Sequence, residues 1–402
     1  MTLEFQKLHQ RRRVIGAAAV AAVLGAAGLT TGVMAANAAT PPVLTSLAYT
    51  ATGAGGGLRL PAGVSAFNGT VYVSNSSVNV LAKVAGGTTT AVAGSLTNYG
   101  EHGDGGQAAS ATLYHPGGTA VDAQGDVFVA DSGDNVVREI TAAGVIRKVA
   151  GTGIAGLGIA LPIGFPATLS SLDYAQGVAV DGHGNVFVAD TYNNRVVKVT
   201  PRGLVFAVAG DGVAGYSGDR RLAAFAQLNQ PAGVAVDAQG NLYIADSANN
   251  VIRRVDARTG VITTVAGDFA AGKASNGLGG FSGDGGPATS ARLNDPQGVA
   301  LDGAGDLFIA DTFNNAVREV TPAGTITTVV NSATAGGGIP AAGGETNNAA
   351  PTASKLNTPY GIGIDPSTET LYVADTKNSK IAAVTGLAQS GSAAGPAAPA
   401  AS

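Results

Sequence analysis

A unit of roughly 60 residues recurs along this chain, and the repetition constrains the fold more than any other sequence feature does. A clear copy runs from Leu228 to Gly267 and contains four short apolar runs separated by turn residues. Such a unit predicts a four-stranded antiparallel meander. One sheet of this kind leaves both faces uncovered, so the copies are expected to pack against one another.

Six copies align on the leucine that opens each unit, at spacings of 53 to 65 residues. These leucines are Leu60, Leu113, Leu172, Leu228, Leu293 and Leu356. The second run of each unit shows the repeat best, as in Asp126-Val-Phe-Val-Ala-Asp131. Four-stranded units at this period predict an all-β fold, a six-bladed β-propeller of four-stranded antiparallel blades.

The last unit has three of the four runs, the third of which lies at residues 380–385. A run that suits the missing strand stands before the first unit, at Leu44–Tyr49. Pairing of this N-terminal strand with the last blade would remove two exposed sheet edges. We therefore predict that the ring is closed by residues 44–49.

The segments G-V-A-V-D, G-N-L-Y-I-A-D-S-A-N-N and I-T-T-V-A-G resemble NHL repeats over residues 44–385. The resemblance implies a six-bladed propeller. Similar NHL propellers serve as extracellular sensor domains of bacterial receptor kinases and as protein- or RNA-binding modules. Others are amidating lyases, and look-alike propellers include lactonases that hold a divalent metal in the central channel.

The N-terminus predicts export. Lys7 and Arg11–Arg13 precede an apolar, Ala-rich run, and Ala36-Asn37-Ala38 offers a cleavage site. Residues 1–38 are therefore predicted to be a signal peptide of a secreted or cell-surface protein, with the twin-arginine and general secretory routes both open. An uncleaved membrane anchor is the third possibility. Residues 386–402 contain Ala, Gly, Pro and Ser with a few other uncharged residues, and predict a disordered tail.

Composition narrows the classes of partner. The 402 residues include no Cys, which excludes disulfides and thiolate metal sites. Removing residues 1–38 takes away four of 23 basic and one of 27 acidic residues, leaving a net charge of about −7. This balance disfavours nucleic acid, whose phosphates need a basic surface. We expect a monomer with no cofactor and no bound metal, and membrane contact only if the signal is not cleaved.

Acidic residues recur in register at the ends of two runs. The turns after the first run share an Asp and a Gly, which is typical of tight turns. The Asp that closes the second run is followed by Ser or Thr and, in four copies, by Asn at the third position. We expect these side chains to bind their own loop backbone and have no catalytic role. They are Asp131, Asp190, Asp246, Asp311 and Asp375.

The loops after the second run vary inside this frame, and the long linkers between units emerge on the same face of a meander. Variation within a fixed frame is how a fold presents a particular surface, although ordinary solvated loop tips would look alike. Five residues at the varied positions are candidates for contact with a partner: Tyr192, Arg195, Phe313, Lys377 and Lys380.

Two sequence features suggest a phosphate-binding or catalytic site, but neither provides all the residues that such a site needs. The linker motif Gly-Asp-Gly-Gly lacks the helix with Lys and Ser or Thr that a phosphate loop needs, so we expect a turn. His102 and His115 lie on the loop-rich face, but no Ser-His-Asp set is discernible. The first runs read almost uniformly Gly-Val-Ala-Val-Asp, with nothing polar singled out for the channel. A non-enzymatic module that binds a protein or a glycan is therefore the leading hypothesis, and a propeller lyase or metal-dependent lactonase-like hydrolase is the alternative.

Overall fold

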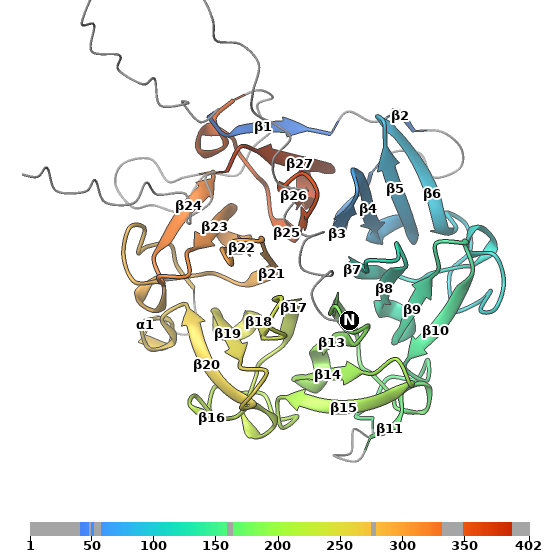
Figure 1. Ribbon diagram of the computed structural model, residues 1–402, viewed down its shortest axis with the longest axis horizontal. Coiled ribbons are helices and arrows are strands. Elements are labelled where there is room, and N and C mark those ends of the chain that lie inside the picture. The colour runs from blue at the N-terminus through green and yellow to red at the C-terminus, as the bar shows by residue number, and fades with distance from the viewer. Residues whose placement is uncertain are drawn as a thin grey trace, which may run out of the picture. The chain divides into compact units, whose positions relative to one another are not determined.

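The six innermost strands line a central axis, and each begins a blade (Figure 1). The computed structural model describes residues 41–47, 50–51, 58–158, 164–274, 279–331 and 349–387. The innermost strands are β3 (Pro61–Phe67), β7 (Pro116–Val121), β12 (Ala175–Val180), β17 (Pro231–Val236), β21 (Pro296–Leu301) and β25 (Pro359–Asp365).

The next two strands of each blade follow by antiparallel pairing. The second strands are β4 (Thr70–Asn75), β8 (Val127–Asp131), β13 (Val186–Asp190), β18 (Leu242–Asp246), β22 (Leu307–Asp311) and β26 (Thr370–Asp375). The third strands are β5 (Val80–Ala85), β9 (Val136–Ile140), β14 (Arg195–Val199), β19 (Val251–Val255), β23 (Ala316–Val320) and β27 (Lys380–Thr385).

The fourth strands form the rim in five blades, namely β6 (Thr88–Gly94), β10 (Ile146–Ala150), β15 (Leu204–Ala209), β20 (Val261–Ala266) and β24 (Ile326–Val330). Three of these blades carry a fifth, two-residue strand outside the fourth, which shortens the exposed edge. The extra strands are β2 (Thr50–Ala51), β11 (Phe165–Pro166) and β16 (Arg221–Leu222).

The sixth blade is closed from the other end of the chain, as the missing fourth run predicted. β1 (Val43–Ser46) pairs antiparallel with β27, placing Val43 opposite Thr385 and Ser46 opposite Ala382. Leu44 is fully buried in the apolar cluster between the fifth and sixth blades. The strand begins one residue earlier than predicted, and Leu47 continues the pairing by donating its N–H to the carbonyl oxygen of Ile381 at 2.9 Å. Ala48 and Tyr49 lie outside the described residues.

Six apolar clusters fill the spaces between neighbouring blades. Along β8, Phe128 faces the third blade while Val129 faces the first. The second strand of a blade is thus buried on both faces, which explains why it reads as a continuous apolar run rather than as an alternating one.

Short helical turns occupy two recurring places. One follows each second strand: η1 (Ser76–Val78), η3 (Ser132–Asp134), η5 (Thr191–Asn193), η7 (Ser247–Asn249), η9 (Thr312–Asn314) and η11 (Thr376–Asn378). The other lies in the linkers between blades: η2 (Ala108–Ser110), η4 (Ala167–Leu169), η6 (Ala223–Phe225), η8 (Ala288–Ser290) and η10 (Pro351–Ala353). The one α-helix of the described residues is α1 (Phe269–Ala274), and within these residues no helix has the length and hydropathy of a membrane span.

Candidate binding site at the mouth of the central channel

The Asp that closes each second strand ties its loop to the linker before it. Asp246 Oδ1 accepts the backbone N–H of Asn229 at 2.7 Å, and the carboxylates of the other four repeats accept the equivalent N–H at 2.7 to 2.8 Å. In the first blade, Asn75 Oδ1 accepts the N–H of Arg59 in the same way. The sequence correctly predicted a structural role, but the backbone partner lies in the preceding linker, and the contact of Asp246 inside its own loop is with the Asn249 side chain, at 2.8 Å.

The Ser or Thr and the last Asn of these loops join neighbouring blades. Ser247 donates to the carbonyl oxygen of Pro296 at 2.6 Å, and Asn250 Oδ1 accepts the N–H of Asp295 at 2.7 Å. Thr376 donates to the carbonyl oxygen of Pro61 at 2.7 Å, which continues the series across the closure of the ring. The polar residues that recur in register are therefore occupied by the scaffold.

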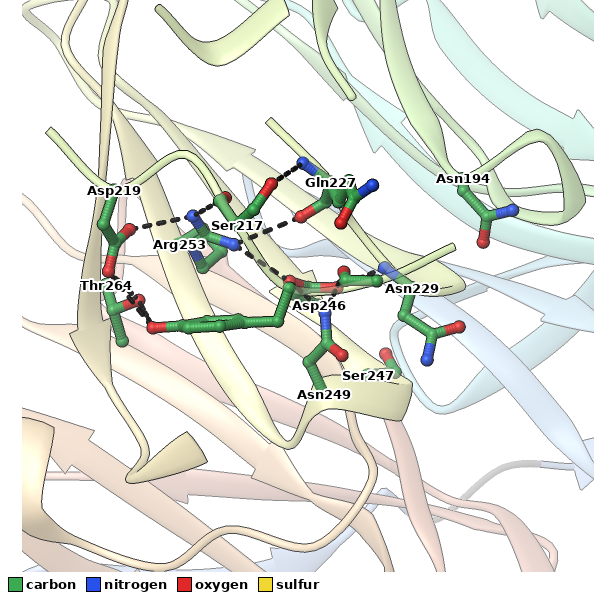
Figure 2. Close-up of polar contacts among 12 residues, drawn as sticks. Asn194, Ser217, Asp219, Gln227, Asn229, Asp246, Ser247, Asn249, Arg253 and Thr264 are labelled. Carbon is green, nitrogen blue, oxygen red and sulfur yellow. Dashed lines mark hydrogen bonds and ion pairs between the residues drawn. The ribbon is translucent and has the colours of Figure 1, made fainter. Parts of the chain in front are cut away.

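In three blades, a buried arginine of the third strand pairs with two carboxylates. One is the Asp that closes the second strand, and the other is an Asp of the preceding linker. Arg253 lies between Asp246 and Asp219, and its Nη2 approaches Asp219 Oδ1 at 2.8 Å (Figure 2). Arg138 pairs with Asp104 at 2.9 Å and Arg318 pairs with Asp284 at 2.7 Å. These three partners are the Asp residues of the linker motifs, so the motif that invited a phosphate hypothesis anchors a buried cation instead.

Burial sets the protonation behaviour of this network. It raises the pKa of Asp246 to about 6, although Asn249, Asn229 and Arg253 favour the ionised form. The arginines were not predicted from the sequence, because they lie inside strands rather than in loops. Their signal was a fixed separation of 34 residues from the linker Asp, repeated three times.

The innermost strands approach one another so closely that each needs a glycine. A Cβ on Gly177 would overlap the carbonyl oxygen of Ala232, and one on Gly298 would overlap that of Tyr360. This steric requirement explains the Gly that opens the Gly-Val-Ala-Val-Asp runs. It also brings the side chains on either side of the glycine into the channel.

Three rings of side chains follow from this arrangement. The mouth ring precedes the innermost strands, and all its members have φ between 47° and 56°: Leu60, His115, Tyr174, Gln230, Asp295 and Thr358. The upper channel ring is Ala62, Gly117, Gln176, Ala232, Gln297 and Tyr360. The lower channel ring, two residues further on and on the same face of each strand, is Val64, Thr119, Val178, Val234, Val299 and Ile362.

A cavity of about 300 Å³ lies in the channel, and all members of the upper and lower channel rings line it. Ala62 and Gly117 leave space beside the first and second blades, where Leu60, Ser77 and His115 extend the lining toward the loops. The bulky members Gln176, Gln297 and Tyr360 stand on the third, fifth and sixth blades. The cavity is therefore asymmetric even though the scaffold is repetitive.

Hydrogen bonds hold the three bulky side chains of the upper channel ring in place. Gln176 Nε2 donates to Tyr360 Oη at 2.5 Å, although the third and sixth blades stand opposite each other in the ring. Gln297 Nε2 donates to Asp295 Oδ1 at 2.8 Å. Burial raises the pKa of the Tyr360 phenol, helped by the nearby Asp295 carboxylate, and burial also raises the pKa of Asp295.

Aromatic rings stand beside the mouth. Tyr192 stacks on Tyr174 with ring centroids 5.1 Å apart, and Tyr114 lies between Tyr99 at 5.0 Å and His115 at 4.6 Å. Tyr192 keeps 55% of its surface exposed while Tyr174 lines the cavity. An exposed aromatic surface thus continues into the channel.

The five predicted contact residues have unequal positions. Tyr192 and Phe313 are each 55% exposed, and Lys377 is exposed at the equivalent place in the sixth blade. Lys380 is half-buried at the start of β27. Arg195 is 6% exposed, because its Nε donates to Asp190 Oδ2 at 2.7 Å and its Nη1 donates to the carbonyl oxygen of Gly158. Arg195 therefore stabilises the third blade and offers a partner little surface.

The histidines also differ in position. His115 lines the cavity, whereas His102 lies exposed in the linker and His183 lies exposed in a turn between the first two strands of the third blade. Within the described ranges, no three His, Cys, Asp or Glu side chains gather as a metal site would require.

Gln176, Gln297 and Tyr360 were not predicted from the sequence, because the innermost strands look alike from their glycine onward. The informative position is the residue just before that glycine, where Ala or Gly in three repeats contrasts with Gln or Tyr in the other three.

Apart from His115, the mouth ring was not predicted, because its members differ in every blade and only the recurrent left-handed backbone relates them. The alignment of Leu60 with Leu113 was wrong: Leu60 is 45% exposed and lies at the position of His115, and the buried Leu58 is the equivalent of Leu113.

The fold and its repeat define an NHL-type six-bladed propeller. A family model of the teneurin NHL domain matches residues 75–158, 208–276 and 279–375, and an NHL-repeat model matches residues 172–199. The chain belongs to this family of NHL-repeat propellers.

The chain spans only a small part of the length of the teneurins that it matches. Human Teneurin-4 is 31% identical over 232 residues, which cover 54% of this chain and 8% of Teneurin-4. An auxiliary nutrient binding protein from Bacteroides thetaiotaomicron superposes with a TM-score of 0.59 at 13% identity, covering 85% of this chain and 76% of that one. A gluconolactonase from Xanthomonas campestris superposes with a TM-score of 0.53 at 14% identity, covering 86% and 95%. At 13% and 14% identity, these two solved structures show a common fold alone.

Proposed function

We propose that this protein is a non-enzymatic binding module whose partner, a protein or a glycan, docks on the loop-rich face around the channel mouth. One observation carries the proposal: the recurrent polar residues of this face are bound within the scaffold, whereas three of the varied residues, Tyr192, Phe313 and Lys377, remain exposed. Tyr192 and Phe313 serve as the aromatic anchors, since binding energy concentrates in such residues. Lys377 and Lys380 supply positive charge at the sixth blade, and Arg195 holds the loop that carries Tyr192.

Export belongs to the same proposal. Its support is the basic segment with Lys7 and Arg11–Arg13, followed by the apolar run and the Ala36-Asn37-Ala38 site. N-terminal sequencing of protein recovered outside the cytoplasm tests it, with a new terminus after Ala38 as the expected result. Recovery of the intact N-terminus in the membrane fraction would instead establish an anchor.

The partner is tested by pull-down and glycan array with the propeller from residue 39 onward. The double variant Tyr192→Ala/Phe313→Ala should weaken binding at least about tenfold, which corresponds to about 1.4 kcal/mol. His183→Ala is the matched control, because this exposed side chain lies in a short turn on the opposite face. Loss of binding in the control with retention in the double variant would place the site on that face.

The cavity beside Gln176, Gln297 and Tyr360 is the observation that favours a lyase or lactonase-like alternative. Metal analysis of the purified propeller, together with lactone hydrolysis assays, separates the two functions. The binding proposal expects no tightly held stoichiometric ion and no turnover. Turnover that is lost on Tyr360→Phe at unchanged stability would overturn it.

A further inference from the structure

The cavity is built to admit a small ligand from the loop-rich face. Its volume of about 300 Å³ lies at the lower end of the range for small-molecule sites. Ala62 and Gly117 leave the side of the first and second blades free, and Gln176, Gln297 and Tyr360, which reach in from the third, fifth and sixth blades, form the polar wall that bounds this space. The scaffold does not require this asymmetry, because Ala occupies the same position in the fourth blade at Ala232.

The polar wall has unused hydrogen-bonding capacity. Gln297 Oε1 is buried and accepts no hydrogen bond from the described residues. Tyr360 Oη accepts from Gln176 Nε2, so its own proton is available to an acceptor. A buried acceptor without a donor is unfavourable, and a ligand that donates a hydrogen bond at this point would relieve that cost.

The charge of the lining selects among ligands. Among the described residues that line the cavity there are hydroxyl, amide, phenol and imidazole groups but no Lys, Arg, Asp or Glu. A phosphate or carboxylate would meet no cation, and Asp295, which binds Gln297 just outside the lining, would repel it. The chemistry therefore fits an uncharged ligand rich in groups that both donate and accept.

Apolar surface accompanies these polar groups. The lower channel ring is apolar except for Thr119, and the Tyr174 ring adds an aromatic wall that continues to the exposed Tyr192. A pyranose ring has this combination of hydroxyl groups around its edge and C–H groups on its faces. Its neighbour in a glycan would then lie over Tyr192 on the way out of the channel.

We propose that the cavity binds a terminal neutral sugar of a glycan, with Tyr360 and Gln297 bonding its hydroxyl groups and Tyr174 contacting the ring. The inference rests on the proposed binding function and names the partner class for its central site. It also predicts the direction of the glycan, which leaves the cavity past Tyr192.

The test uses the propeller from residue 39 onward and a panel of neutral hexoses, N-acetylhexosamines and their disaccharides, with glucuronic acid and glucosamine as charged counterparts. Calorimetry and ligand-observed NMR measure binding. Neutral sugars should bind, and disaccharides should bind more tightly than monosaccharides. Ala62→Leu, which fills the free side, should weaken binding at least tenfold, and Tyr360→Phe, which removes one hydroxyl, should weaken it about fivefold.

His183→Ala is the control for both variants, and each variant is first checked for an unchanged melting temperature. Two cavity variants keep the test decisive if one does not fold. No binding of any neutral sugar at millimolar concentration, or tighter binding of the charged counterparts, would overturn the inference. A glycan or protein partner that is lost on Tyr192→Ala/Phe313→Ala, but retained by both cavity variants, would leave the proposed function standing and remove the cavity from it.

Discussion

The guanidinium group of Arg253 lies 3.3 Å from the Asp246 carboxylate, and neither side chain has any exposed surface. The pair stands between the second and third strands of the fourth blade, and Asp246 simultaneously accepts the linker N–H of Asn229. A single carboxylate thus holds a strand, a loop and a linker. The same contact, made by Arg318 and Asp311 in the fifth blade, has the same 3.3 Å separation.

Removing Asp246 should therefore destabilise the propeller strongly. Asp246→Ala leaves the Arg253 charge buried without this partner and strands the Asn229 N–H. Loss of one member of a buried pair typically costs about 3 to 5 kcal/mol. Urea unfolding measures the change, with the partly exposed Arg254→Ala as a control that should cost less than about 1 kcal/mol. An Asp246→Ala protein of unchanged stability would show that the carboxylate has some other purpose.

Closure of the ring should depend on β1. Deleting residues 43–46 exposes an edge of β27 and the apolar cluster around Leu44, so the melting temperature should fall sharply. Leu44→Ala alone should cost about 2 to 5 kcal/mol, as for other buried leucines. Thr45→Ala, at a half-buried position of the same strand, is the control. A deletion variant that melts like the parent would mean that the last blade is completed in another way.

The close approach of the innermost strands gives a steric prediction. Gly177→Ala should disrupt the third and fourth blades, because the added Cβ meets the Ala232 carbonyl oxygen. Gly182→Ala places the same atom where nothing lies within 4 Å and should be tolerated. Comparing the expression and melting temperatures of the two variants checks the prediction, and equal behaviour would contradict it.

Glu319 should make stability depend on pH. Burial, with the nearby Asp306 and Asp302, raises its pKa from 4.5 to about 7. Between these values the folded state binds more protons than the unfolded state, so stability should fall as pH rises from about 4.5 to 7. The side chain is only partly buried, so the loss discounted for solvent screening is roughly 1 to 2 kcal/mol.

A second blade supplies the matched control for this carboxylate. Glu139 occupies the equivalent place and binds Arg147 through two hydrogen bonds of 2.8 and 2.9 Å, whereas Thr327 stands opposite Glu319. Thr327→Arg should therefore reduce the pH dependence and stabilise the protein at pH 8, as should Glu319→Gln. Urea unfolding at pH 5 and pH 8 measures both. A pH dependence that persists in Glu319→Gln would assign it to other groups.

The sequence predicted the ring and its six blades because these depend on features that recur, and it predicted the closure because the sixth repeat lacks its fourth run. The apolar runs predicted the strands, the Asp-Gly pairs predicted the turns, and the missing strand after Thr385 predicted the closure. The structure confirms all three. The buried arginines escaped prediction because Arg253 in a strand looks like an exposed residue until the linker Asp219 is placed beside it.

The cavity was harder to predict because it depends on residues that do not recur and that lie far apart in the sequence. Gln176 and Tyr360 are 184 residues apart in sequence and meet only because the third and sixth blades face each other across the axis. Arg195 shows the corresponding limit at the surface: its position in the repeat varies, but its guanidinium folds back onto Asp190. Variation in a repeat therefore locates candidate positions without telling which side chains turn outward.

The antiparallel pairing of β1 with β27 has a mechanical consequence. Val43 and Thr385 are paired at the same end of the two strands, so the chain enters and leaves the ring at one point. Tension between the flanking segments would load the Val43–Thr385 pair first and then peel the bonds one after another toward Ser46 and Ala382. A propeller tethered through both flanking segments would thus lose the β1–β27 pairing at low force, because its hydrogen bonds break one at a time. The other blades would stay folded. Optical-tweezer extension from residues 41 and 387 would show a small first step of this kind, and a single high-force rupture would rule it out.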